Sequence, residues 1–201
     1  MSEQDSDKWD RRYADDSHRK RAQPGEFIAE WRAKIPPGRA LDVACGLGQK
    51  SMYLAEVGFQ VDAIDVSAVG LAQAKKTAQN RGLDINWIQH DLDLPYAFDG
   101  KYNLILVMWY VDLALIRQLC DHLAPGGFLL CEEHLLSDYA GPELIGPKNA
   151  EFRVAPDALS AAVAGFDVAY YDEYVGPSDD HQSPADAIIS RARLVVRGGS
   201  Q

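Results

Sequence analysis

Short apolar runs and amphipathic stretches alternate along most of the 201-residue chain. The apolar runs are typical of buried strands, whereas the stretches between them carry apolar residues at the three-to-four spacing of helices. Strands are therefore predicted at 40–44, 60–64, 84–89, 102–108 and 127–132. Helices are predicted at 26–35, 48–57 and 67–81, and after Asp112. This alternation is typical of an α/β fold with a mostly parallel sheet.

Capping residues and helix-breaking residues mark several of these boundaries. Ser67 and Asp112 stand where helix N-caps are favoured, and Gly82 follows the helix that Ser67 begins. Pro36-Pro37-Gly38 ends the first predicted helix. Towards the C-terminus the pattern predicts a helix and two strands, at 156–164, 166–174 and 187–196. The last of these strands alternates between apolar and polar positions.

The segment from Ala40 to Asp65 contains two predicted strands with a glycine-rich turn and a helix between them. Gly46 and Gly48 let the backbone turn sharply after the first strand and leave room for a ligand beside the main chain. The second strand ends at Asp65, whose carboxylate can accept hydrogen bonds from the two hydroxyl groups of a ribose. This is the arrangement of a nucleoside pocket in an open α/β sheet.

The spacing of this turn disfavours a dinucleotide. Dinucleotide-binding proteins use the motif G-x-G-x-x-G, in which the third glycine allows close packing of helix and strand. Ser51 occupies that third position here, and Ala44 stands two residues before Gly46. The turn is therefore a poor pyrophosphate cradle, so a nucleoside ligand without phosphates fits better. An NAD(P)-dependent oxidoreductase is the less favoured alternative.

The motifs in this region resemble those of class I S-adenosylmethionine-dependent methyltransferases. Asp42-x-x-x-Gly46-x-Gly48, followed by Asp65-x-Ser67, resembles the first two motifs of that family. Further matches, in the expected order, are Asp91-Leu92, Tyr102–Trp109 and Leu123–Gly127. Trp9-Asp10-x-x-Tyr13 also resembles the opening of small-molecule members such as the tellurite-resistance and thiopurine methyltransferase group. The motifs cover residues 9 to about 135, and the remainder resembles the family in topology.

The resemblance implies a Rossmann-like three-layer sandwich. Its mostly parallel seven-stranded sheet has the order 3-2-1-4-5-7-6, and the last strand is antiparallel. We expect residues 1–23 to form a cofactor-closing segment, partly helical and disordered at its extreme end. Residues 24–197 then form a single methyltransferase domain. The sequence departs from the family pattern at Ala44, where alanine tolerates an extended conformation, and at Asn103, where an acid often begins the fourth strand.

The resemblance also implies where S-adenosylmethionine binds. The expected cofactor-binding residues are Trp9, Tyr13, Asp42, Ala44, Gly46, Gly48, Asp65, Val66, Asp91, Leu92 and Met108. Tyr13 or Arg12 is expected near the carboxylate of the cofactor, and Asp91 near the adenine amino group. Asp42 is expected to accept hydrogen bonds from amides of the turn and to lie near the amino group of the cofactor. Trp9 and Tyr13, four residues apart, share one helix face and are alternatively plain packing residues. Met108, Trp109 and Tyr110 are expected either to surround the sulfonium group of the cofactor or to pack in the core.

Transfer from a sulfonium needs no dedicated acid–base pair when the acceptor is sulfur, tellurium or an ionised oxygen. His134 and Tyr110 are the weak catalytic candidates, and His134 is alternatively a solvated turn residue. Glu132, Glu133 and His134 are consecutive on a strand and point to alternating faces, so no metal site is expected. The long segment 135–155 is a candidate substrate lid.

The composition of the chain limits which classes of molecule it is expected to bind. The net charge is −10 without a basic stripe, which disfavours nucleic acid as a substrate. A polar N-terminus and the absence of a membrane-length apolar run indicate a cytoplasmic protein with no membrane partner. Cys45, Cys120 and Cys131 form no C-x-x-C pair and are expected to be buried, reduced thiols.

The function favoured by the sequence is methyl transfer to a small-molecule acceptor. The acceptor is open among tellurite, a thiol, an amine and a small carboxylate, and no oligomeric state is indicated. The alternative is a non-catalytic protein that binds S-adenosylmethionine and regulates a partner.

Overall fold

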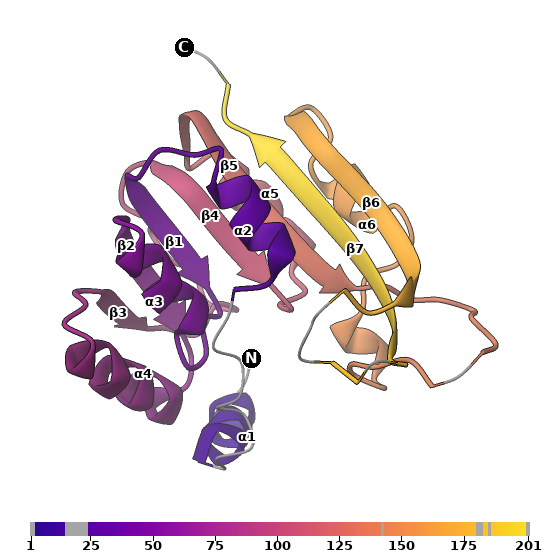
Figure 1. The fold of residues 1–201 in the computed structure, drawn as a ribbon, viewed down its shortest axis with the longest axis horizontal. Helices are drawn as coiled ribbons and strands as arrows, with labels where there is room; N and C mark the ends of the chain where they lie inside the picture. Colours follow the sequence, from indigo (N-terminus) through magenta and orange to yellow (C-terminus); the bar gives the residue numbers. More distant parts are fainter. Residues whose placement is uncertain (1–2, 15–23, 142, 180–182, 185, 200–201) are drawn as a thin grey trace.

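One seven-stranded sheet forms the centre of the fold, with strand order β3-β2-β1-β4-β5-β7-β6 (Figure 1). The strands are β1 (Arg39–Val43), β2 (Gln60–Asp65), β3 (Asn86–Gln89), β4 (Tyr102–Met108), β5 (Leu123–His134), β6 (Asp167–Pro177) and β7 (Ile188–Arg197). Neighbours among β1 to β5 are parallel, and β7 is antiparallel to both β5 and β6. The computed structural model describes residues 3–14, 24–141, 143–179, 183–184 and 186–199. This topology confirms the fold that the resemblance implies.

Helices cover both faces of the sheet and complete three layers (Figure 1). The helices are α1 (Glu3–Ala14), α2 (Glu26–Arg32), α3 (Gln49–Glu56), α4 (Ala68–Asn80), α5 (Leu113–Cys120), α6 (Ala158–Ala162) and the 3-10 turn η2 (Ala150–Phe152). Side chains of α2, α3 and α4 belong to the core on one face, and side chains of α5 and α6 belong to the core on the other.

The sequence of β4 is an almost unbroken apolar run because both faces of this strand are covered. Ile105 and Val107 lie in the core beneath α5 and α6, whereas Leu106 and Met108 lie in the core beneath α2 and α3. Both sets are buried, so neither face of the strand meets water. A parallel strand that is covered on both sides needs apolar residues at every position.

Most predicted boundaries are confirmed to within a few residues. The Ser67 hydroxyl accepts a hydrogen bond from the Gly70 amide (2.9 Å), and the Asp112 carboxylate accepts one from the Leu115 amide (2.9 Å). Both residues are therefore the N-caps that the sequence predicted. α2 ends at Arg32 rather than at residue 35, because the chain turns there before the two prolines.

The last strand, β7, alternates between an apolar face and a polar face that are both covered. β7 lies between β5 and β6, and Arg191 and Arg193 share one of its faces. Arg191 is buried, although it belongs to the polar face. Alternation in this strand therefore separates two covered faces, not a buried face from a solvated one. The polar face is stabilised by ion pairs to carboxylates on the neighbouring strands.

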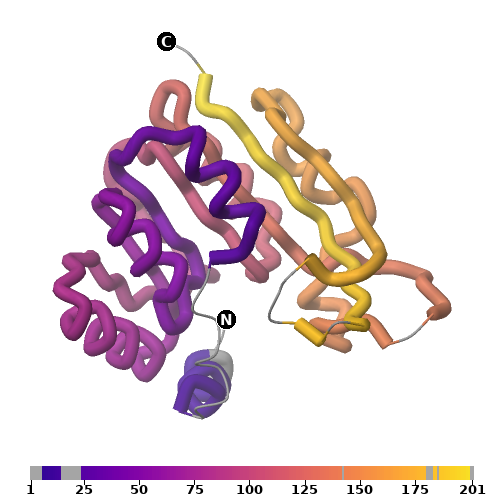
Figure 2. Tube along the Cα trace, viewed as in Figure 1, coloured from indigo at the N-terminus to yellow at the C-terminus, as the bar shows by residue number. Residues whose placement is uncertain are grey.

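The N-terminal helix α1 docks against α4. The Asp10 carboxylate accepts hydrogen bonds from the Ser67 hydroxyl and from the Val69 amide (3.1 Å), at the start of α4. The Gln73 side chain donates to the Tyr13 carbonyl (2.9 Å). Figure 2 shows α1 beside α4, on the side of the sheet where the parallel strands end. Residues 1–2 and 15–23, including the predicted disordered end, lie outside the described residues.

Candidate functional site

The carboxyl ends of β1 and β4 adjoin where the strand order reverses, which is where open α/β sheets bind ligands. The turn after β1 begins there. Its Cys45 amide donates to the Ile64 carbonyl of β2 (3.0 Å), and its Gly48 amide donates to the Cys45 carbonyl (2.9 Å). Ala44 has φ +53°, so it adopts the left-handed conformation and not the extended one that we expected. For a residue with a Cβ this costs on the order of 1 kcal/mol or more.

Asp65 ties this turn to the start of α4. Its Oδ2 accepts a hydrogen bond from the Gly46 amide (2.7 Å), and its Oδ1 accepts one from the Ser67 amide (2.8 Å). The side chain is buried, and the resulting desolvation raises the pKa of the carboxyl, while the two amides act in the opposite direction. The carboxylate therefore stands at the tip of β2, beside the glycine turn.

Asp42 lies deeper in the same region, within β1. Its Oδ2 accepts a hydrogen bond from the Ser51 hydroxyl (2.5 Å) of α3, where we expected amides of the turn. Burial raises the pKa of the Asp42 carboxyl, and the positive charge of Lys50 opposes that shift. Ser51 is fully buried and therefore serves as the partner of a buried carboxylate.

The two glycines of the turn make room for aromatic rings. A Cβ on Gly48 would lie 2.4 Å from the Trp87 ring of β3, and a Cβ on Gly46 would lie 2.7 Å from the Tyr13 hydroxyl. We expected this room to serve a ligand, but in this structure protein side chains use it. α1 therefore places Tyr13 directly against the glycine turn.

Trp9 and Tyr13 share one face of α1, as their spacing predicted. Their rings stack with centroids 5.6 Å apart, and the Arg12 guanidinium lies 5.0 Å from the Trp9 ring. Burial, and then the nearby Asp65 carboxylate, raise the pKa of the Tyr13 phenol, so it stays protonated at neutral pH. A neutral hydroxyl therefore faces the acid at the tip of β2.

Further predicted residues line the same edge of the sheet. The turn after β3 contains Asp91, whose Oδ1 accepts a hydrogen bond from the Asp93 amide (3.0 Å), and Leu92, which is buried. The Tyr110 hydroxyl donates to Asp93 (3.4 Å), so the chain after β4 reaches this turn. Val66 is half-buried next to Asp65.

Trp109 and Tyr110, which follow β4, lie on opposite faces of the sheet. The Trp109 amide donates to the Glu132 carbonyl (2.9 Å), and Trp109 adopts φ +64°. Trp109 then packs on the α2–α3 face, whereas Tyr110 packs on the α5–α6 face. Tyr110 therefore lies with Asp91 and Asp93, on the opposite side of the sheet from Trp109.

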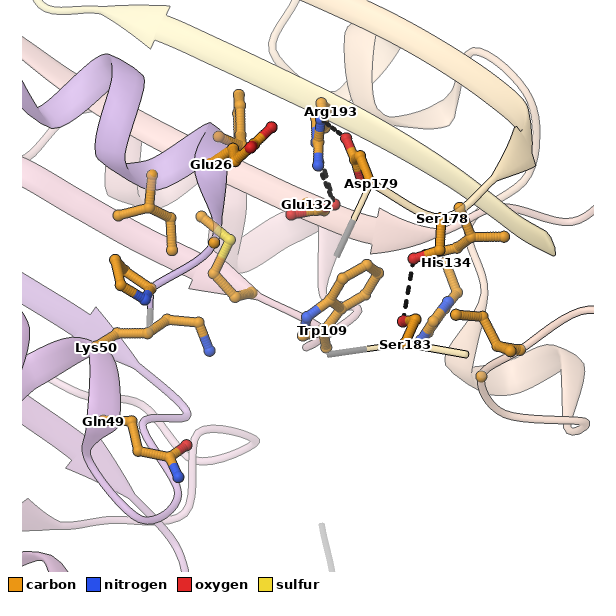
Figure 3. Close-up of a pocket in the computed structure, with 18 residues that line it drawn as sticks. Glu26, Gln49, Lys50, Trp109, Glu132, His134, Ser178, Asp179, Ser183 and Arg193 are labelled. Carbon is orange, nitrogen blue, oxygen red and sulfur yellow. Dashed lines mark hydrogen bonds and ion pairs between the residues drawn. The ribbon is translucent and has the colours of Figure 1, made fainter. Parts of the chain in front are cut away.

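A cavity of about 180 Å³ opens on the α2–α3 face, beside the ends of β4 and β5 (Figure 3). Met108, Trp109 and His134 line it from the sheet, and the Trp109 and His134 rings stack with centroids 4.2 Å apart. Gln49 and Lys50, the first residues of α3, line it from the glycine turn. His134 is thus a half-buried wall residue and not a solvated turn residue.

Charged residues close the far side of this cavity. The Arg193 guanidinium pairs with Glu132 (3.0 Å) and Asp179 (2.7 Å), as drawn in Figure 3. Arg191 pairs with Asp179 (3.2 Å) and with Asp172 (2.9 Å). Three strands thus contribute to a connected group of ion pairs beside the cavity.

The segment after β5 also borders the cavity. Ile145 and Gly146 line it, and a Cβ on Gly146 would lie 2.4 Å from the His134 ring. The segment is held at two points: the Ile145 amide donates to the Ile188 carbonyl of β7 (2.8 Å), and the Val154 amide donates to the His134 carbonyl of β5 (2.8 Å). The predicted lid is therefore anchored at both β7 and β5.

Comparison with known proteins identifies the family. A family described as a methyltransferase domain matches residues 40–127. A demethylmenaquinone methyltransferase from Thermus thermophilus is 30% identical over 169 residues, which cover 67% of this chain and 76% of that protein. The chain belongs to the class I S-adenosylmethionine-dependent methyltransferases. It spans about half the length of several other curated relatives that it matches.

Solved structures share the fold of this methyltransferase. TehB from Haemophilus influenzae has a TM-score of 0.70 and 19% identity, and the match covers 96% of this chain and 66% of that one. The N-methyltransferase NodS from Bradyrhizobium japonicum, solved with S-adenosyl-l-homocysteine, has a TM-score of 0.65 and 17% identity. That match covers 96% of this chain and 97% of NodS.

The structure of the methyltransferase separates the predicted residues into two groups. Tyr13, Asp42, Gly46 and Asp65 meet around the glycine turn, and Met108 and His134 meet at the cavity. Tyr110 joins neither His134 nor the cavity. The sequence reasoning missed Lys50, Arg193 and Asp179. Lys50 lies two residues after Gly48 of the glycine motif and so carried a local signal, whereas the Arg193–Asp179 pair depends on strand order.

Within the described residues, no group of three or more His, Cys, Asp or Glu side chains is placed to hold a metal ion. In the same part of the methyltransferase, no helix combines the length and the apolar character that a bilayer crossing requires.

Proposed function

We propose that this methyltransferase moves a methyl group from S-adenosylmethionine to a small-molecule acceptor by in-line displacement. The observation that carries the proposal is that the glycine turn and the cavity adjoin. The turn that ends at Gly48 continues directly into Gln49 and Lys50, which line the cavity beside Met108. A nucleoside held at the turn and an acceptor held in the cavity would therefore meet at the end of β4.

The residues at the turn fit S-adenosylmethionine. Asp65 is a buried acid at the tip of β2, and Gly46 forms a cradle that a Cβ would close against Tyr13. Asp65 would accept the ribose hydroxyls, because each carboxylate oxygen keeps a lone pair beyond its bond to an amide. Asp91 and Leu92 would hold the adenine.

The other end of the cofactor would lie beneath α1. The Tyr13 hydroxyl and Arg12 would hold the methionine carboxylate, and Trp9 would cover them. Asp42 would lie near the amino group, with Ala44 and Val66 supplying backbone contacts. Tyr13 already rests on the glycine turn, so α1 would close over the bound cofactor as the resemblance implies.

The bound cofactor supplies a methyl group on a positively charged sulfur, which keeps the electron pair of the broken carbon–sulfur bond. The protein then has to hold the acceptor in line and exclude water. Met108 and Trp109 form the apolar wall for that purpose. His134 faces the cavity and would take the proton of an acceptor that is not already ionised. Tyr110 is a poor base, because burial raises the pKa of its phenol and it lies on the other face.

The 135–155 segment would act as the acceptor-side lid. Gly146 rests on the His134 ring, and Ile145 lines the cavity. In addition, the Lys8 ammonium of α1 lies 4.9 Å from the Phe152 ring of this segment. α1 and the 135–155 segment are therefore in contact at this point.

Calorimetry with S-adenosylmethionine and S-adenosylhomocysteine tests the proposal, combined with an assay for S-adenosylhomocysteine release on a panel of thiols, amines, phenols and tellurite. We expect both nucleosides to bind and Asp65→Asn to weaken them by more than tenfold. Asp84→Asn, an exposed acid before β3, is the matched control. Binding without release on any acceptor would favour a regulatory protein, and no heat with either nucleoside would overturn the proposal.

A further inference from the structure

We propose that Lys50 binds a carboxylate or similar oxyanion of the methyl acceptor, so that the substrates of this site are small anionic molecules. The inference rests on the proposed function, because it concerns the acceptor cavity of that function. It goes further in naming the charge of the acceptor and the residue that selects it.

Lys50 has the position of a ligand-binding cation. It is the second residue of α3 and lines the cavity, and Figure 3 shows its side chain extending from the helix towards Trp109. The residue is half-buried, and its charge acts on the buried Asp42 and Glu133 carboxyls. It forms no hydrogen bond or ion pair with any described residue. A partly desolvated ammonium that no anion contacts directly is unfavourable, and an incoming anion would reduce that penalty.

The other charges of the cavity already have partners. Arg193 is held by Glu132 and Asp179, and Asp179 is also held by Arg191. An acceptor anion at Arg193 would have to displace these carboxylates. An acceptor cation would have to take Glu132 from its arginine. The remaining acid, Glu26, is exposed at the start of α2. Lys50 is therefore the group in the described wall that is ready for a charged ligand.

The remainder of the wall limits the acceptor in size and polarity. The cavity volume is about 180 Å³, and Met108, Trp109, Ile145 and Ile189 supply an apolar surface. Such a space fits a molecule with a short carbon skeleton and one charged end. The anion would lie at Lys50, and the apolar body would lie against Trp109.

Lys50 follows the glycine turn closely enough for a competing assignment, in which it binds the carboxylate of the cofactor itself. The two assignments differ in which ligand loses affinity when the charge is removed. The test therefore measures both ligands on the same variants.

The experiment uses three carboxylate and amide pairs as acceptor probes: mercaptoacetate with mercaptoacetamide, glycine with glycinamide, and 4-hydroxybenzoate with 4-hydroxybenzamide. Affinity is measured by calorimetry on the full chain saturated with S-adenosylhomocysteine, and S-adenosylmethionine affinity is measured separately. The variants are Lys50→Met, which keeps length without charge, and Lys50→Arg, which keeps charge. Lys76→Met, an exposed position on α4, is the matched control.

We expect at least one carboxylate to bind wild-type protein about tenfold or more tightly than its amide. Lys50→Met should abolish that preference and leave S-adenosylmethionine affinity within about twofold, while Lys50→Arg keeps most of the preference. Lys76→Met should match wild type. The inference is overturned if no carboxylate is preferred, or if Lys50→Met weakens S-adenosylmethionine as strongly as the carboxylate. In both cases intact nucleoside binding leaves the cofactor assignment standing, whereas loss of nucleoside binding in wild type overturns the proposed function itself.

Discussion

The Tyr110 amide donates a hydrogen bond to Oε1 of the buried Glu133 side chain at 2.9 Å. This bond holds the chain where it leaves β4, immediately after Trp109 with its left-handed backbone. It therefore helps direct Trp109 into the cavity beside β4 and Tyr110 towards the turn after β3. A fully buried residue that lines neither region thus sets the geometry of both.

Substitution of Glu133 separates its hydrogen bond from its charge. We expect Glu133→Ala to lower the free energy of unfolding by about 2–3 kcal/mol, because the Tyr110 amide loses its acceptor and a cavity forms. Glu133→Gln keeps a carbonyl oxygen in place and should cost less than about 1 kcal/mol at pH 5. Urea denaturation measures both. Equal losses in the two variants would contradict a role for this hydrogen bond.

The stability difference between wild type and Glu133→Gln should depend on pH. Burial raises the pKa of Glu133 well above its usual range, so the folded state holds a proton that the unfolded state releases near its ordinary pKa. This contribution to stability is present below the unfolded pKa and is lost as pH rises towards the folded pKa. Relative to Glu133→Gln, wild type should therefore lose stability between pH 5 and pH 8. A constant difference over that range would show that the carboxyl is already ionised when folded.

Gly146 provides a test of the acceptor-side lid. Gly146→Ala adds a Cβ 2.4 Å from the His134 ring, at φ +103°, so the segment has to move away from the cavity. We expect turnover, or carboxylate binding, to fall by about tenfold or more, while S-adenosylmethionine affinity stays near wild type. Gly82→Ala is the control, because Gly82 also has a positive φ (+68°) but faces open space. Equal effects of the two variants would show that backbone strain alone causes the loss, which would contradict a role for this segment as a lid.

Asp10 provides a test of the cofactor-side cover. Asp10→Ala removes the acceptor for Ser67 and Val69, which joins α1 to α4. We expect faster amide hydrogen exchange in α1 and several-fold faster dissociation of S-adenosylhomocysteine, with global stability reduced by no more than about 1 kcal/mol. Asp7→Ala changes an exposed acid on the same helix and should leave both rates unchanged. Unaltered dissociation from Asp10→Ala would show that α1 does not cover the cofactor.

Ser51 links the turn motif to stability. Ser51→Gly restores the third glycine of the dinucleotide motif but leaves the buried Asp42 carboxylate without its hydroxyl partner. We expect it to lower the free energy of unfolding by about 2 kcal/mol and to create no affinity for NADH. Ser51→Ala, the control for the hydroxyl alone, should lose a similar amount. NADH binding to wild type or to Ser51→Gly, detected by thermal shift, would revive the oxidoreductase alternative.

Local features of the chain were readable from the sequence. Three kinds of feature depend on residues that are neighbours in the chain: the apolar runs, the caps at Ser67 and Asp112, and the glycine turn. Their patterns can therefore be recognised in the sequence. The alternation of strands and helices was strong enough to indicate the α/β class. The family resemblance supplied the strand order, which periodicity alone does not contain.

The sequence by itself therefore determined the α/β elements and the position of Asp65 at the end of a strand. Only the tertiary structure decided that Tyr13 rests on Gly46, that Glu132 pairs with Arg193, and that Lys50 faces Trp109 across a cavity. These pairs lie far apart in the chain and are brought together by sheet order and helix docking. Their energies depend on burial and on the partners available after folding, which no local pattern of residues specifies.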